Sequence, residues 1–462
     1  MLEATRPIEI PATRTLAEFG SQLQWEQIPS EVIAHAKLCV LDAIGCCLFG
    51  STLPWTKILT DTIVEQGGKP DASIWGTGHL TSVAQAAMVN CAAGHSFELD
   101  DLHTAALIHA TTLSVPVGMA FSERDGASGR EFLLACIAGF EIGLRVGIAG
   151  THGLFHRGFH PQGASGVFAA AGTAARMLRF GADKTQHTLG IAASMASGLM
   201  AAQEGAMVKR LNSGHAGYAG AMAALLASGG YTGILNAIEA PYGGFLATYS
   251  DDPEQELVVR GLGSQWETLA IGFKAFPTVS CIHGPLKILR EIMTERNLQA
   301  KDIARIDVAC GTFSYRHTVW PYQASGLTEA QMNLYYGLST MAVEGKVFVD
   351  QFSNDRLSNP EIIEFSKRIF VEIDPTIDAL GPACRDAVRV TVATSDGQNV
   401  TREKRWRPGS PEDPMTPDDL KSKFLRLADG RWPAEKSYRL IALIEELDAL
   451  PSIAAIAECL RT

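Results

Sequence analysis

The stretch GVFAAAGTAARMLRFG, residues 166–181, is the part of the sequence that decides the fold class. It is rich in Ala and Gly, with a few larger apolar side chains between them. Small side chains on helices let two backbones approach closely, so this segment predicts a helix inside a tightly packed bundle. Segments of the same kind occur at 81–97 and 214–230. Residues 13 to about 265 are therefore expected to be mostly helical.

Outward on the N-terminal side, residues 30–50 predict a further helix. Ser30 is placed to cap it, Glu31 lies in its first turn, and the pattern stops at Gly50. The longest uncharged run lies between Lys184 and Glu204. Its small residues predict a packed helix of a soluble protein, not a membrane span.

The pattern changes near residue 270. Strands are expected within 303–313, 368–377 and 387–406, the last with a hairpin turn at Asp396–Gly397, and helices within 286–297 and 328–345. After Pro411, residues 416–430 and 434–450 are expected to be helical again. The predicted fold is mainly α, with a large all-helical domain and a smaller α+β lid domain. The expected boundaries are a helical domain at 1–267, the lid at 268–405 and C-terminal helices at 406–462 that rejoin the first domain.

Composition excludes several classes of protein. The chain has 462 residues with 50 acidic and 39 basic side chains, a net charge of −11 that argues against a nucleic-acid-binding protein. Its nine cysteines form no CxxC pair and are expected to be buried and reduced. The N-terminus has no apolar core of the signal-peptide type. We expect a cytoplasmic protein with no membrane segment.

Familiar motifs for nucleotides, metalloprotease zinc and the serine nucleophile elbow do not occur in the sequence. His152, His156 and His160 are spaced by four, as metal ligands on one helix face would be. Gly158 and Pro161 interrupt that helix, so no metal is expected.

Residues 95–110, HSFELDDLHTAALIHA, concentrate acid and imidazole between two helical segments. One interpretation is a solvated acidic loop, and the other is a general acid/base loop. The candidate side chains are Glu98, Asp100, Asp101, His103 and His109.

His160 precedes Pro161, and Pro is favoured at the first position of a helix. The imidazole is then expected at a helix N-terminus, where anions bind and a neutral ring exchanges protons near neutral pH. Further candidates are three cations that would bind substrate carboxylates, one histidine at the domain junction and two tyrosines of an aromatic-rich loop. They are Lys209, Arg210, Lys274, His283, Tyr315 and Tyr322.

Together these segments resemble the MmgE/PrpD family, which includes 2-methylcitrate dehydratase, cis-aconitate decarboxylase and iminodisuccinate epimerase. The resemblance rests on ELDDLH with HATTLSVPV, on GFHPQGASGVFAAAGTAARML and on VKRLNSGHAGYAGAMAALLA, and on GFKAFPTVSCIH and TEAQMNLYYGLSTMAVEG nearer the C-terminus. It implies a helical domain with an α+β lid, a site between them and a homodimer. It implies catalytic roles for Asp100, His109, His160, Lys209 and Lys274.

The loop after Asp101 is about a residue longer than the family pattern, and Ala110 replaces a frequent proline. Glu98, Asp100 and Asp101 therefore remain alternatives for one role, as do His103 and His109. Tyr315 and Tyr322 are alternatives for a lid tyrosine.

The expected function is proton abstraction next to a carboxylate on a small anionic di- or tricarboxylate, without a metal or organic cofactor. A 2-methylcitrate dehydratase-like hydro-lyase is the leading hypothesis. An epimerase of a dicarboxylate, a cis-aconitate decarboxylase-like lyase and a carboxylate-binding protein without turnover are the alternatives.

Overall fold

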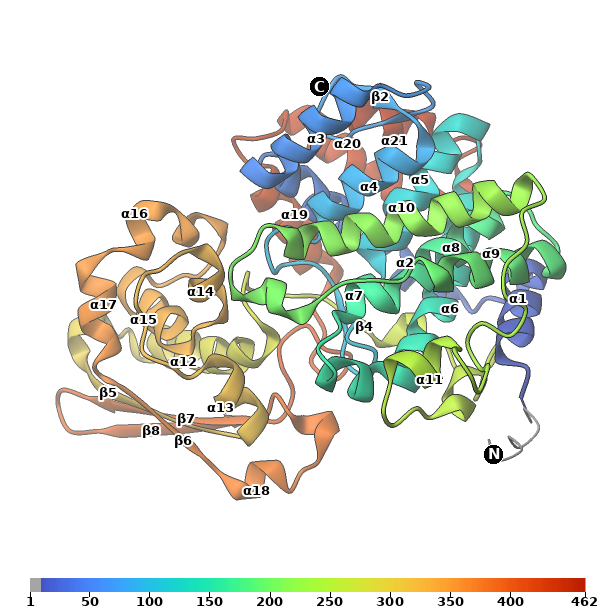
Figure 1. Ribbon diagram of the computed structural model, residues 1–462. Helices are drawn as coiled ribbons and strands as arrows, with labels where there is room; N and C mark the ends of the chain where they lie inside the picture. The colour runs from blue at the N-terminus through green and yellow to red at the C-terminus, as the bar shows by residue number, and fades with distance from the viewer. Residues whose placement is uncertain (1–9, 462) are drawn as a thin grey trace, which may run out of the picture.

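The computed structural model describes residues 10–461, and its elements form two lobes (Figure 1). The larger lobe is a bundle of helices, and the smaller lobe lays helices over a sheet. The predicted class, mainly α with a smaller α+β part, is confirmed.

The helices of the larger lobe pack at short distances. A Cβ built on Gly143 would lie 2.4 Å from the Cβ of Ala169, and one on Gly220 would lie 2.5 Å from the Cβ of Ala170. Only glycine allows these helix crossings, which is the reason for the small-residue composition. The elements are α1 (Ala12–Gln22), α2 (Ser30–Ser51), α3 (Pro54–Gln66), β1 (Ala72–Ser73), β2 (Leu80–Thr81), α4 (Val83–Gly94), β3 (Leu102–His103), α5 (Thr111–Asp125), α6 (Gly129–His156), α7 (Pro161–Ala164), α8 (Gly166–Met177), α9 (Ala182–Ser194), α10 (Val208–Ser228) and α11 (Phe245–Tyr249).

The smaller lobe contains a four-stranded sheet of order β6-β5-β7-β8. β5 pairs parallel with β6 and antiparallel with β7, and β7 and β8 form the expected hairpin around Gly397, whose φ is +87°. The elements are α12 (His283–Arg296), β5 (Ile303–Cys310), α13 (Thr312–Thr318), α14 (Leu327–Met332), α15 (Leu334–Glu344), α16 (Asn354–Leu357), α17 (Pro360–Ser366), β6 (Ile369–Ile373), α18 (Pro375–Asp378), β7 (Val388–Thr394) and β8 (Asn399–Lys404).

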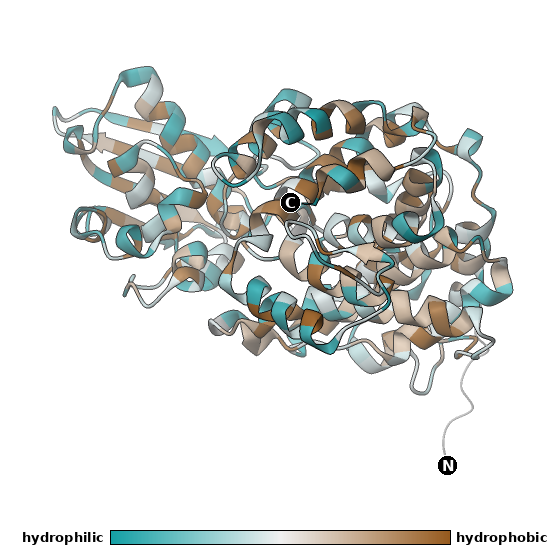
Figure 2. Cartoon of the chain, turned by 90° about the horizontal axis from the view of Figure 1, so that it is seen from above, coloured by the Kyte–Doolittle hydropathy of each residue, from teal (hydrophilic) through white to brown (hydrophobic). Residues whose placement is uncertain are grey.

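The C-terminal helices α19 (Pro417–Ala428), α20 (Ala434–Glu445) and α21 (Ala454–Cys459) lie with the larger lobe. The ring of Phe424 on α19 would lie 3.0 Å from a Cβ at Gly45 of α2. Figure 2 shows hydrophobic residues on the inner helices of the larger lobe and hydrophilic ones on outer turns.

Two segments, the first containing Phe273 and the second containing Gly409, connect the lobes and lie against each other. The N–H of Phe273 donates to the carbonyl of Gly409 over 2.7 Å. Gly409 has φ +84°, and a Cβ there would lie 1.8 Å from the carbonyl oxygen of Phe273. In the first segment, β4 (Ile271–Gly272) pairs antiparallel with β3. This first connection, the crossing segment, is thereby fixed to the loop that follows α4.

Among residues 10–461, two helices are long and apolar enough to cross a membrane, and both are core helices. In α2, 72% of the apolar window is buried inside the fold, and in α6 the fraction is 89%. This burial is typical of a soluble protein. All nine cysteines, which lie within the described residues, are buried and unpaired, as expected.

Three local predictions were wrong. Ser30 does not cap α2, because it is already the first helical residue and Pro29 precedes it. In the uncharged run, α9 ends at Ser194, and the chain then turns through Gly198 with φ +117°. The helix expected over 328–345 is divided at Asn333, whose side chain accepts from the N–H of Tyr336 and caps α15.

Candidate active site

The site is built around the loop between α4 and β3, residues 95–101, which lies between the two cores. Phe97 and Leu99 pack into the core of the smaller lobe, and the carbonyl of Phe97 accepts from the side chain of Gln331 over 2.8 Å. Glu98 stands between them with φ +55°, a strained conformation for a residue other than glycine. Apolar anchors on both sides keep the Glu98 carboxylate in place.

Three cations surround that carboxylate. Lys209 and Arg210, at the start of α10, both contact Oε1, the arginine over 2.9 Å. Lys274, from the crossing segment after β4, contacts Oε2 over 3.0 Å. Burial alone would raise the pKa of Glu98, but the three cations lower it well below its usual value. The group therefore holds one negative and three positive side chains, all of them buried.

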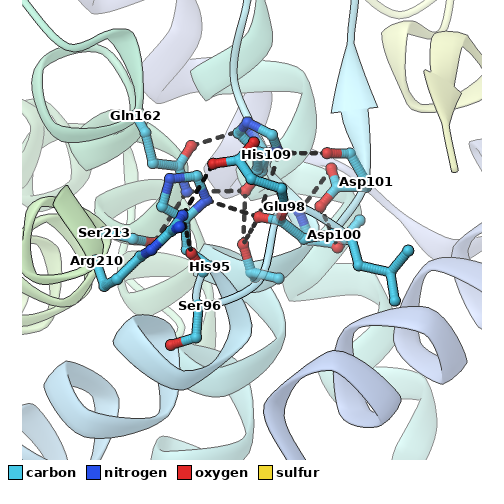
Figure 3. A network of polar contacts seen from close by, with 12 residues as sticks. His95, Ser96, Glu98, Asp100, Asp101, His109, Gln162, Arg210 and Ser213 are labelled. Atoms are coloured by element: carbon cyan, nitrogen blue, oxygen red, sulfur yellow. Dashed lines mark hydrogen bonds and ion pairs between the residues drawn. The ribbon is translucent and has the colours of Figure 1, made fainter. Parts of the chain in front are cut away.

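A second cluster, of imidazoles around Asp100, lies beside the first (Figure 3). His95 places Nδ1 2.7 Å from Asp100 Oδ2, and Nδ1 of His109 lies 3.2 Å from the same oxygen. The His95 ring centroid is 4.7 Å from that of His109 and 5.6 Å from that of His160. His95 and His109 lie at the two ends of the segment between α4 and α5, and His160 directly precedes α7.

Burial sets the protonation of these groups. It lowers the pKa of His109 to about 3, an effect that the carboxylate of Asp100 opposes. It also lowers the pKa of His160 well below its usual value, with further lowering by His95 and Lys209. Burial would raise the pKa of Asp100, but His109 and His95 reverse this and lower it. Asp100 is therefore ionised, while His109 and His160 are neutral at neutral pH.

Asp101 faces away from the cations. Its carboxyl group accepts from the hydroxyl of Thr111 over 2.5 Å, and burial together with Asp100 raises its pKa well above the usual value. The carboxyl groups of Asp100 and Asp101 therefore differ in protonation: Asp100 is ionised and Asp101 is protonated.

His160 occupies the predicted position before Pro161, the first residue of α7. Its backbone N–H donates to the carbonyl of Gly198 over 3.0 Å. Nδ1 of the ring accepts from the side-chain amide of Asn212 over 3.1 Å, which leaves the neutral ring's proton on Nε2. Asn212 lies on α10, one turn after Lys209.

Several predicted residues lie outside both clusters. His103 directs Nε2 to Glu267 over 3.2 Å and accepts from the N–H of Ala106 at Nδ1. His283 contacts the carbonyl of Thr278 over 3.3 Å. Of the two histidine alternatives on the loop, the structure brings His109 to the cluster.

The two candidate tyrosines belong to the smaller lobe. The hydroxyl of Tyr322 donates to the carbonyl of Leu357 over 2.7 Å, and Tyr315 packs against the same core. The structure brings neither to the cations or the imidazoles.

Sequence reasoning missed His95, Gln162 and Asn212. Gln162 accepts from the N–H of His109 over 2.9 Å and donates to Ser213 over 3.0 Å. Asn212 could have been found from its spacing of three from Lys209 on one helix. His95, the residue directly after α4, carried no local signal except its closeness to the acidic loop.

A cleft of about 620 Å³ opens between the lobes above Arg210. Trp55 and Met207 line it from the larger lobe, and Arg316 and His317 line it from the smaller. Trp55 also donates to the hydroxyl of Ser96 over 3.0 Å, so the cleft reaches the loop at residues 95–101.

Ligand atoms of His95, Asp100 and His109 lie within 4.8 Å of one another, a spacing that a metal ion requires. In this arrangement, however, Nδ1 of His95 is hydrogen-bonded to Oδ2 of Asp100, and Nδ1 of His109 is hydrogen-bonded to the backbone carbonyl of Asp101. Hydrogen bonding accounts for these contacts.

Comparison with known proteins agrees with this geometry. The MmgE/PrpD N-terminal domain matches residues 14–258, and the MmgE/PrpD C-terminal domain matches residues 276–449. The chain belongs to the MmgE/PrpD family. Cis-aconitate decarboxylase of Aspergillus terreus is 31% identical, covering 97% of this chain and 96% of that protein.

Two further relatives have the same or a related description. The cis-aconitate decarboxylase-like protein oryM of Aspergillus oryzae is 31% identical over 93% of this chain and 92% of its own length. Human cis-aconitate decarboxylase is 25% identical over 97% of this chain and 94% of its own length.

Proposed function

We propose that this MmgE/PrpD lyase removes CO₂ from a small unsaturated tricarboxylate of the cis-aconitate type. The observation that carries the proposal is the excess of cations at Glu98. Lys209, Arg210 and Lys274 together exceed its single negative charge, beside neutral imidazoles. A site with unbalanced buried cations is built to take up a further anion.

The chemistry follows from these charges. Loss of one carboxylate as CO₂ leaves an electron pair that spreads over an allylic system to the carbon next to a remaining carboxylate. Cations at that carboxylate stabilise the developing charge, and the carbon then takes up a proton that solvent supplies through an imidazole. Lys209 and Lys274 are the proposed clamps, and Arg210 with Arg316 of the cleft is placed to meet a second carboxylate.

Dehydration of a 2-hydroxy acid, as in 2-methylcitrate dehydratase, is the second candidate. It needs a base for the α-proton and an acid for the departing hydroxyl. The neutral imidazole of His109, whose Nε2 is free because Nδ1 is bonded to the carbonyl of Asp101, is the candidate base, and the protonated carboxyl of Asp101 is the candidate acid. This division of roles favours the hydro-lyase over the epimerase.

The test is to incubate the protein with cis-aconitate, 2-methylcitrate, citrate and iminodisuccinate in heavy water. CO₂ release with one deuterium at the protonated carbon supports the decarboxylase. An alkene without CO₂ supports the hydro-lyase, and deuterium at a retained stereocentre supports the epimerase. Binding that raises the melting temperature without any product would leave only a carboxylate-binding protein.

We also propose that the protein is a cytoplasmic homodimer that associates through the larger lobe. Ile58 on α3 is 57% exposed, and Met207 and Val208 at the start of α10 are 57% and 49% exposed. Light scattering is expected to give twice the chain mass of 49.5 kDa, and Ile58→Glu with Val208→Glu is expected to give the monomer.

A further inference from the structure

We propose that Asn212 is a positioning residue that makes His160 the N–H donor of the site, while His109 offers a bare nitrogen. This role rests on the proposed lyase function and adds a residue to it. Two observations carry it: the contact of Asn212 with Nδ1 of His160, and the glycine turn that confines both side chains.

The side chain of Asn212 holds one nitrogen of the His160 ring. Nδ2 of the amide donates to Nδ1 of His160 over 3.1 Å. An amide nitrogen has only protons to offer, so Nδ1 supplies a lone pair and the neutral ring carries its proton on Nε2. Burial lowers the pKa of His160 well below its usual value, with further lowering by His95 and Lys209. The ring is therefore neutral at neutral pH.

The turn that follows α9 confines this contact. The backbone N–H of His160 donates to the carbonyl of Gly198 over 3.0 Å. Gly198 has φ +117°, and a Cβ there would lie 3.3 Å from Cγ of Asn212 and 3.3 Å from Cβ of His160. A Cβ at Gly163 would also lie 3.3 Å from Cβ of Asn212. The amide and the ring are thus packed closely, and this packing restricts the rotation of both side chains.

His109 carries its proton on the other ring nitrogen. Its Nδ1 is hydrogen-bonded to the backbone carbonyl of Asp101, and a carbonyl oxygen can only accept. A neutral His109 therefore has its proton on Nδ1 and a bare Nε2, the reverse of His160. Both rings lie next to the ring of His95, at centroid distances of 4.7 Å and 5.6 Å. One imidazole thus offers the site an N–H, and the other offers a lone pair.

Asn212 also ties the N–H donor to the cations. It lies on α10, three residues after Lys209, whose ammonium group contacts Glu98. Residues three apart are neighbours on a helix surface, so α10 sets the spacing between the carboxylate clamp and the His160 ring. The contact with Asn212 is the one hydrogen bond of that ring among the described residues, which leaves Nε2–H available to a substrate. An N–H beside a cation stabilises negative charge that develops on a bound carboxylate.

Asn212→Asp reverses the contact with almost no change in shape. A carboxylate can only accept, so the proton of His160 is expected to move to Nδ1 and to leave Nε2 bare. In serine proteases, a substitution that stabilises the wrong histidine tautomer keeps the geometry and lowers kcat about 10⁴-fold. We expect Asn212→Asp to lower kcat by about 10²–10⁴. A new negative charge that only repelled the acid would raise KM and leave kcat unchanged.

Asn212→Leu is the matched control. It keeps the size of the side chain and adds no charge, but it no longer fixes the tautomer, so the proton of His160 is shared between both nitrogens. Its kcat is expected to lie between those of the wild type and Asn212→Asp. If Asn212 only filled space and held the ring, Asp would be the milder change, because it is closer to Asn in shape and polarity. Asn212→Asp with a higher kcat than Asn212→Leu would therefore overturn the proposal.

A second measurement needs no turnover. ¹⁵N NMR of histidine-labelled protein with tricarballylate, a saturated tricarboxylate, reports which ring nitrogen carries the proton. In the wild type we expect the proton of His160 on Nε2 and that of His109 on Nδ1. Asn212→Asp is expected to move the first to Nδ1 and to leave the second in place. A wild-type His160 protonated on Nδ1, or a proton that stays on Nε2 in Asn212→Asp, refutes the role of Asn212. Absence of turnover with every acid tested refutes only the proposed function.

Discussion

Two buried carboxylates, one beside the loop at residues 95–101 and one within it, have different surroundings. Asp42 on α2 pairs with one cation, Lys423 on α19, over 2.6 Å. Glu98 contacts three. The first pair is balanced in charge, and Lys423 also donates to the carbonyl of Leu99 over 2.6 Å, so it supports the loop. The second group has an excess of positive charge. Charge balance thus separates a structural ion pair from an anion site.

The largest effect is expected from removing the imidazole of His160, which lies beside the anion site. His160→Gln is expected to lower kcat by about 10²–10⁴, because the amide neither gives nor takes a proton. Steady-state kinetics on the preferred acid measure it. The melting temperature is expected to change by only a few degrees, and near-normal turnover would remove His160 from the mechanism.

The second-largest effect is expected from removing one of the excess cations at Glu98. Lys209→Ala is expected to lower kcat/KM by about 10²–10³, since a preorganised charge at the developing anion is lost. Glu98 keeps Arg210 and Lys274 as partners, so the fold is expected to stay intact. If Lys209→Ala unfolds the protein instead, the cation is structural and the comparison fails.

Substitution in the balanced pair of Asp42 and Lys423 is expected to lower stability and not turnover. Lys423→Met leaves Asp42 buried without a partner and is expected to cost about 3–5 kcal/mol of unfolding free energy, measured by urea denaturation. The double variant Asp42→Leu with Lys423→Met is expected to recover most of it. Loss of turnover without loss of stability would place Lys423 with Lys209 instead.

The last prediction concerns the pH dependence of stability. In the folded protein His109 stays neutral down to about pH 3, whereas the unfolded ring takes up a proton near pH 6.5. The unfolded state binds more protons between these values, so stability falls as pH decreases through this window, by about 1.4 kcal/mol per unit for one histidine. His109→Asn is expected to reduce this slope by one proton. The exposed His79→Asn is the control, and an equal change there would contradict the assignment.

Much of the site could be predicted because acids, imidazoles and lysines are rare in the Ala- and Gly-rich segments of this sequence. Glu98, Asp100, His109, His160, Lys209, Arg210 and Lys274 all lie in the two clusters. His103, His283, Tyr315 and Tyr322 do not, because each makes its contacts elsewhere in the fold. Sequence proximity cannot tell His103 from His109, since they lie on one loop and only β3 pairing turns the first away.

The sequence by itself determined the fold class, since close helix packing requires small residues at regular spacing, and it determined that acids, imidazoles and lysines gather in a few segments. Only the tertiary structure decided which charges meet. Glu98 joins cations that lie 111 and 176 residues away in the chain, and the protonation of each group depends on burial and on neighbours that folding alone brings within a few ångströms.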